Sequence, residues 1–207
     1  GHAFLQTLRS LNILGADILY FPKHMLRTTT VEGLEAWFDE RVWEGNNQTS
    51  GGHHNTFEVV PLLMNLGDSA LENTFYNKLC EQQHIETGTW PKPINSAKNI
   101  PNISRTFAYT LLHRATGKIP PNPERMLDTI LSIQLQNGFW EFEPSFDTMD
   151  SAYLLVRIPR LIDYKKKESM VALDSLANAL PVFWHQQKNS FHAKSSLDSG
   201  NCPHFWF

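Results

Sequence analysis

The chain has 207 residues, with 18 Lys and Arg against 21 Asp and Glu, and a formal net charge of −3. A chain of this length can bury about 70% of its unfolded surface in one domain, and its near-neutral charge argues against nucleic acid as a partner. Its two cysteines are too few for a disulfide framework, and no apolar run approaches the roughly 20 residues of a membrane span.

The apolar residues recur at intervals of three and four along most of the chain, which is typical of helices. Pro123 marks a helix start, whereas Pro61 and Pro159 are expected to kink or break theirs. The run from Lys165 to Glu168 is expected to be a solvated linker. In chain order the predicted helices span about residues 5–14, 34–42, 59–66, 71–83, 103–115, 123–136, 147–162 and 170–187.

Two markers recur with one period of about 50 residues, which predicts a repeated structure. The first marker is an aromatic residue, and the second is a glycine that follows an apolar run, where a helix end needs a positive φ. Each repeat is therefore expected to be a helical hairpin, and residues 1–207 to form one all-α domain of a longer array. The aromatic markers are Trp43, Trp90, Trp140 and Phe191, and the glycines are Gly15, Gly67 and Gly117.

Two segments have the form Gln, a few residues, Gly, any residue, Trp: they run from Gln83 to Trp90 and from Gln134 to Trp140. They resemble the QW motif of terpene cyclases and protein prenyltransferases, which implies an α/α toroid, here with an incomplete ring. In this motif we expect Gly to allow a tight turn, Trp to cover the hairpin and Gln to bind exposed helix-end groups. The motif residues are thus predicted to be scaffold.

The resemblance does not extend to the catalytic motifs of the isoprenoid enzymes. Asp147 and Asp150 lack the Asp-x-Asp-Asp spacing of class II terpene cyclases, and neither Cys80 nor Cys202 has the nearby Asp of a prenyltransferase zinc site. The run from Gly88 to Lys92 instead looks like a Gly-Gly-Trp-Pro segment of some pectate lyases. This second resemblance points to toroidal polysaccharide lyases and glycoside hydrolases.

Polar residues gather in the loops 44–56, 91–104, 141–150 and 191–204, which in a hairpin toroid would surround the mouth of the cavity. His or Tyr can serve as a base, an acid pair can divide acid and base roles, and Arg can hold a carboxylate. The candidate catalytic residues are His53, His54, Asp147, Asp150 and Tyr153, and the candidate substrate-binding residues are Asn55, Asn102, Arg105, Tyr109 and His192.

Structural roles compete with each of these assignments. His53 and His54 could belong to a solvated loop, Asp147 could cap a helix, Asp150 could favour the helix dipole, and Arg105 could pair with a carboxylate.

The sequence therefore favours a carbohydrate-active enzyme, a lyase or a hydrolase, that acts on a small-molecule or glycan substrate without metal or cofactor. The alternatives are a non-catalytic or fragmentary toroid domain and an isoprenoid enzyme. The cell compartment stays open.

Overall fold

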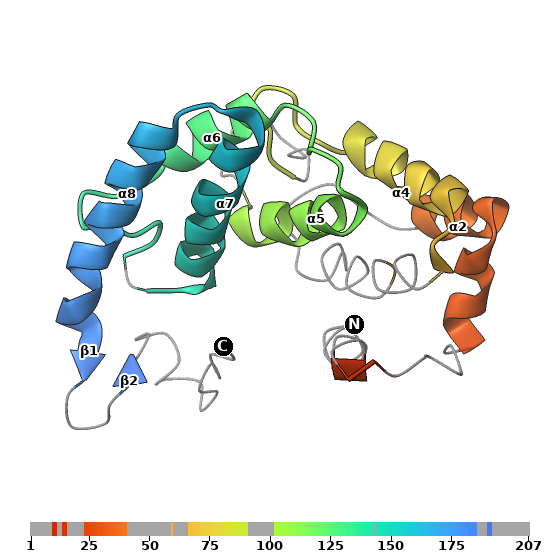
Figure 1. Ribbon diagram of the computed structural model, residues 1–207, viewed down its shortest axis with the longest axis horizontal. Coiled ribbons are helices and arrows are strands. Elements are labelled where there is room, and N and C mark those ends of the chain that lie inside the picture. Colours follow the sequence, from red (N-terminus) through yellow and green to blue (C-terminus); the bar gives the residue numbers. More distant parts are fainter. Residues whose placement is uncertain are drawn as a thin grey trace. The chain divides into compact units, whose positions relative to one another are not determined.

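The computed structural model describes residues 10–11, 14–15, 23–40, 59, 66–90, 102–142, 144–185 and 190–191. Their regular secondary structure is almost entirely helical, which confirms the all-α prediction (Figure 1). Within the described residues, the short strands β1 (Trp184–His185) and β2 (Ser190–Phe191) pair antiparallel. The helices are η1 (Lys23–Thr29), α2 (Val31–Asp39), α4 (Ser69–Glu81), α5 (Ile103–Thr116), α6 (Pro123–Ser132), α7 (Phe146–Ile162), α8 (Lys166–Ala179) and η4 (Leu180–Phe183).

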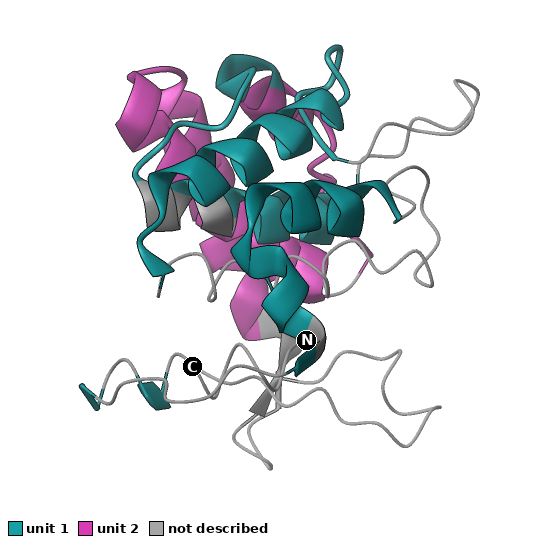
Figure 2. Ribbon diagram, turned by 90° about the vertical axis from the view of Figure 1, so that its right-hand side faces the viewer, with its two compact units in different colours: residues 1–125 teal, residues 126–207 magenta. Residues whose placement is uncertain are grey.

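The chain divides into two compact units, residues 1–125 and residues 126–207 (Figure 2). In the first unit α2 packs against α4 through aromatic side chains. The ring of Phe75 lies 6.1 Å from that of Trp37 and 6.0 Å from that of Phe38, in tilted and edge-on arrangements that aromatic pairs prefer. Asp68 caps α4, since its carboxylate accepts from the backbone N–H of Ala70 at 2.8 Å.

In the second unit α7 packs against α8, and ion pairs secure the start of α8. Lys165 lies 2.5 Å from the Asp128 carboxylate, which also accepts from the Tyr164 hydroxyl, and Lys166 pairs with Asp163 at 2.6 Å. The lysine run was therefore wrongly expected to be a linker, because α8 begins within it at Lys166.

Other helix boundaries match the prediction in part. Helix α6 begins at Pro123 as expected, whereas α7 continues through Pro159 to Ile162. The helix predicted over 170–187 ends at Ala179, where the chain enters η4 and β1.

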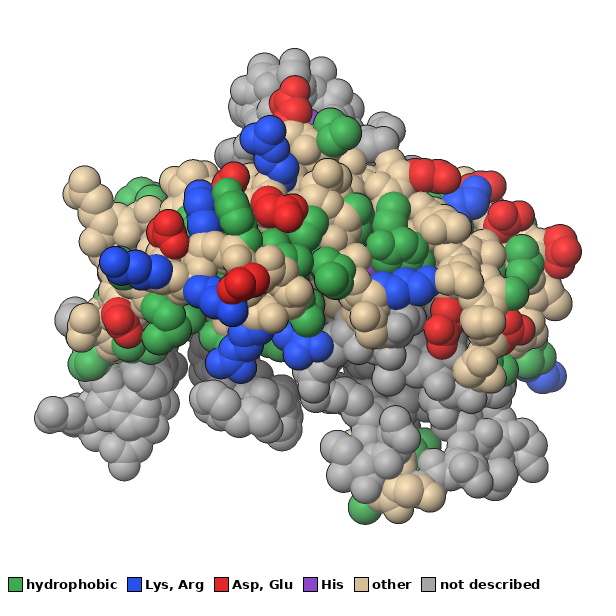
Figure 3. All heavy atoms as spheres, turned by 45° about the horizontal axis from the view of Figure 1, so that its top comes forward, with side chains coloured by type: hydrophobic (Ala, Val, Ile, Leu, Met, Phe, Trp, Pro, Cys, Tyr) green, Lys and Arg blue, Asp and Glu red, His purple; other side chains and the backbone are tan. Residues whose placement is uncertain are grey.

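The three periodic glycines have the positive φ expected of them, between 59° and 70°. Among the described helices, none is long and apolar enough to cross a membrane. The face shown in Figure 3 mixes acidic, basic and apolar side chains.

Candidate functional site

The first Gln-Gly-Trp segment closes the turn between α4 and α5 with side-chain hydrogen bonds. Gln83 is 4% exposed, and its Nε2 donates to the carbonyls of Gly88 at 2.7 Å and Pro121 at 2.6 Å. The side-chain amide of Asn122 donates to Gln83 Oε1 at 2.7 Å. The indole N–H of Trp90 donates at 2.8 Å to the carbonyl of Leu79, in the last turn of α4.

The second segment repeats these contacts between α6 and α7. Gln134 Nε2 donates to the carbonyls of Gly138 and Ala172, both at 2.9 Å. The Trp140 indole N–H donates at 2.7 Å to the carbonyl of Ile130, in the last turn of α6. In both units the second acceptor of the glutamine lies 38 residues further along the chain.

The contacts of the motif residues are those of scaffold, as predicted, but Trp takes the role predicted for Gln. The Trp indole bonds a carbonyl in the last turn of the preceding helix, while Gln ties its own turn to a later segment of the same unit. Gly88 and Gly138 have φ of 66° and 86°, which only glycine adopts without strain.

Three of the predicted binding residues lie in the first turns of α5 or at its start. Asn102 is its N-cap, and the side-chain oxygen accepts from the backbone N–H of Arg105 at 2.9 Å. Arg105 is 2% exposed, and burial lowers the pKa of its guanidinium. Tyr109 is fully buried with its ring edge-on to Trp90 at 5.8 Å, and burial raises the pKa of its hydroxyl. This packing places Tyr109 in the core of the first unit.

His113 completes the buried side of α5. Its imidazole stacks on Trp90 at 6.0 Å and meets the edge of Tyr76 at 5.0 Å. Neither ring nitrogen has a hydrogen-bond partner among the residues that the structure describes. Burial, followed by the charge of Lys118, lowers the pKa of His113 from 6.5 to about 3, so the ring is neutral at physiological pH.

The predicted acids and Tyr153 lie on α7, in the second unit. Asp150 is 4% exposed, whereas Asp147 and Tyr153 are half-buried. Ser145 is the N-cap of α7, with its hydroxyl 3.4 Å from the backbone N–H of Thr148, so Asp147 is not the capping residue. The hydroxyls of Thr148 and Ser151 are buried and have no hydrogen-bond partner within the described part of the chain.

Helices α5 and α7 have six buried positions in common when one is aligned on the other. A shift of 45 residues aligns Arg105 with Asp150 and Thr106 with Ser151, so both helices bury a charged residue beside a hydroxyl. The aligned buried positions are 103, 105, 106, 109, 110 and 113 in α5, and 148, 150, 151, 154, 155 and 158 in α7.

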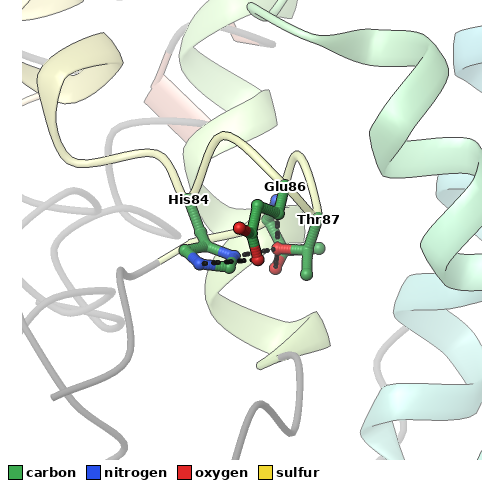
Figure 4. A network of polar contacts seen from close by, with 4 residues as sticks. His84, Glu86 and Thr87 are labelled. Atoms are coloured by element: carbon green, nitrogen blue, oxygen red, sulfur yellow. Dashed lines mark hydrogen bonds and ion pairs between the residues drawn. The ribbon is translucent and has the colours of Figure 1, made fainter. Parts of the chain in front are cut away.

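A polar network that the sequence analysis missed lies inside the first motif turn (Figure 4). His84 Nδ1 lies 2.9 Å from the Thr87 hydroxyl, and His84 Nε2 lies 4.0 Å from the Glu86 carboxylate. The Thr87 hydroxyl also bonds the Thr89 hydroxyl at 2.8 Å and accepts from the Thr89 backbone N–H at 3.4 Å. The sequence signal was three polar residues between the scaffold positions Gln83 and Gly88.

The remaining predicted site residues, His53, His54, Asn55 and His192, lie outside the described residues. The described candidates form two sets, one on α5 in the first unit and one on α7 in the second. No group of three or more His, Cys, Asp or Glu side chains that could hold a metal ion occurs within the described part of the chain.

Comparisons of the chain with known protein families, with curated proteins and with solved structures found no match.

Proposed function

We propose that the chain is a carbohydrate-active enzyme, a hydrolase or a lyase, whose acid and base groups lie on α7. The observation that supports this proposal is the buried carboxylate of Asp150 (4% exposed) between the buried hydroxyls of Thr148 and Ser151. The two hydroxyls have no hydrogen-bond partner among the residues that the structure describes, and burying a hydroxyl without a partner costs stability. Buried polar groups of this kind are concentrated at sites that bind or react.

The arrangement on α7 suits chemistry on a glycosidic bond. Asp147 and Asp150 are separated by three residues, so they are neighbours on the helix surface, and only Asp150 is fully buried. Carboxyl groups in unlike environments can divide the acid and base roles. Tyr153, which is half-buried, lies three residues after Asp150 on the same helix.

The test is turnover of a glycan panel by the full chain. Neutral glucans, xylans and mannans are compared with polygalacturonate and alginate. New reducing ends report any cleavage, and the ultraviolet absorbance of an unsaturated uronate reports elimination. We expect Asp150→Asn to lower the rate at least about 100-fold, the smaller end of acid-base contributions, and Asp174→Asn, an exposed change on α8, to leave it unchanged.

Circular dichroism of each variant controls for folding, and Asp147→Asn repeats the test at the half-buried acid. If no glycan is cleaved, or if both acid variants retain full activity, the proposed function is wrong.

A non-catalytic interaction domain is the second candidate, because the second unit exposes apolar side chains beside the acids of α7. Phe142 is 87% exposed, Phe146 53% and Met149 46%. The Asn137 side-chain amide holds the Phe142 backbone carbonyl at 3.1 Å, so the turn that presents this aromatic ring is anchored. Binding of a glycan without cleavage, weakened by Phe142→Ser, would favour this candidate over the enzyme.

A further inference from the structure

We propose that the turn of the first motif is a second reactive site, at which the Thr87 hydroxyl accepts an acyl group from a small ester. His84 would act as the base and Glu86 as the partner of the imidazolium. A hydroxyl becomes a useful nucleophile when a base lies within about 2.6–3.2 Å and a third group orients that base. The distances are 2.9 Å from Thr87 Oγ1 to His84 Nδ1 and 4.0 Å from His84 Nε2 to the Glu86 carboxylate.

The fold of the turn does not require His84 or Glu86. In the second unit the corresponding turn contains Leu135, Gln136 and Asn137, and none of these side chains can act as a base. The Leu135 N–H nevertheless donates to the Phe139 carbonyl at 2.7 Å, as the His84 N–H donates to the Thr89 carbonyl at 2.9 Å. Asn137 Oδ1 accepts from the Phe139 N–H at 3.1 Å, as Thr87 Oγ1 accepts from the Thr89 N–H, so Thr87 also has a structural role. His84 and Glu86 are therefore additional to what makes the turn.

The hydrogen bonds around Thr87 favour loss of its proton. The carboxylate of Glu86 on the Nε2 side favours the tautomer with a proton on Nε2, which leaves Nδ1 to accept from the Thr87 hydroxyl. The Thr87 oxygen then accepts from the Thr89 hydroxyl at 2.8 Å and from the Thr89 N–H at 3.4 Å. Both donors favour the deprotonated form of this oxygen and so assist transfer of its proton to His84, and the bond from the Thr89 hydroxyl is released when the oxygen attacks.

The reaction is an acyl transfer that needs no further reagent. Thr87 Oγ1 bonds to the acyl carbon of the ester while its proton moves to His84 Nδ1. The bond from the acyl carbon to the leaving oxygen breaks, and the imidazolium returns its proton to that oxygen or, when the leaving group departs as a stable anion, to solvent water. The products are acyl-Thr87 and an alcohol or phenolate. Water, activated by the same imidazole, then releases the acid.

Access limits the substrate to small acyl groups. The side chain of His84 is 18% exposed, and Thr87 is half-buried. Thr89 and Trp90, two and three residues further along the chain, are 2% and 0% exposed. This degree of burial suits an acetyl ester better than a long or branched acyl chain.

The test treats the full chain with p-nitrophenyl acetate. Nitrophenolate release gives the rate, and mass spectrometry of peptides locates the added acetyl group. We expect acetylation at Thr87 that Thr87→Ser retains and Thr87→Val abolishes. His84→Asn keeps a hydrogen-bond acceptor close to the Nδ1 position without a basic nitrogen, and should slow acetylation of Thr87 about 100-fold or more.

Two further variants calibrate the result. Glu86→Gln should slow the reaction only about two- to five-fold, because the carboxylate is 77% exposed. Thr29→Val, which removes a hydroxyl bonded only to a backbone carbonyl in the described contacts, should change nothing.

Trp fluorescence and circular dichroism check that each variant folds. If Thr87→Val does not fold, the acetylation rates of Thr87→Ser and His84→Asn test the proposal instead. Acetylation confined to lysines, or an unchanged rate at Thr87 in His84→Asn, would overturn the proposal. Because the test needs no glycan, its result is independent of the proposed glycan activity.

Discussion

Mild acid should destabilise the first unit through His113. This imidazole is 2% exposed, and its pKa is lowered by burial from 6.5 to about 3. Below pH 6.5 the unfolded chain therefore binds a proton that the folded chain does not bind until about pH 3. The stability that depends on neutral His113 is complete above pH 6.5 and decreases as the pH falls. At about pH 5 the loss is about 2 kcal/mol, from 1.36 kcal/mol per pH unit over about 1.5 units.

Urea unfolding at pH 7.5 and pH 5, followed by tryptophan fluorescence, measures this loss. The matched variant is His113→Phe, which keeps an aromatic ring against Trp90 and Tyr76 and cannot bind a proton. Other titrating groups act equally in both proteins. The loss of unfolding free energy between pH 7.5 and pH 5 is therefore compared between the original protein and His113→Phe, and the difference isolates His113. We expect that difference to be about 2 kcal/mol. A difference below about 0.5 kcal/mol would refute the assignment of a buried, neutral imidazole.

Two further predictions concern the motif turns and are checked by urea or thermal unfolding. Gln83→Ala removes three hydrogen bonds and Gln134→Ala removes two. At about 1 kcal/mol per bond, we expect the free energy of unfolding to fall by about 3 and 2 kcal/mol. A fall no larger than that caused by the exposed change Gln136→Ala would contradict this expectation. Gly138→Ala places Cβ 2.8 Å from a backbone carbonyl of α8 at a φ of +86°, whereas Gly117→Ala at +70° meets nothing within 4 Å. We expect Gly117→Ala to lower the free energy of unfolding by about 1–2 kcal/mol, and Gly138→Ala to lower it by about 1–3 kcal/mol more. Equal losses in the two variants would count against the close packing of Gly138 on α8.

The parts of the fold that could be predicted from the sequence are those set by local patterns. The three- and four-residue apolar spacing identified α4, α5 and α7 to within a few residues, and the glycine period identified positions of positive φ such as Gly117. The start of α8 could not be predicted this way, because it depends on pairing between Lys165 and the distant Asp128. Local charge density suggested a linker where tertiary contacts stabilise a helix.

For the candidate site, the sequence predicted which residues could take part and did not predict how they are buried or what they contact. The sequence indicated that Asp150 and Arg105 belong to comparable segments, but their burial follows from which side of each helix packs inward. Tyr109 shows the same limit, since its spacing did not reveal that Trp90 covers its ring. The His84 network was missed because its hydrogen bonds depend on how one turn folds back on itself, which no periodic pattern encodes.

The two motif turns share some residues and differ in others. Gln, Gly and Trp make matching contacts in both units, so the turn is fixed by positions at its ends. Among the side chains between them, Thr87 and Asn137 both accept from the backbone N–H two residues further along, whereas the other positions differ in type between the two turns. A rigid turn with variable interior positions is a suitable place for reactive side chains, because the scaffold supplies the alignment that catalysis needs. His84 occupies such an interior position beside Thr87, whereas the acid and base groups that we propose on α7 depend on helix packing for their alignment.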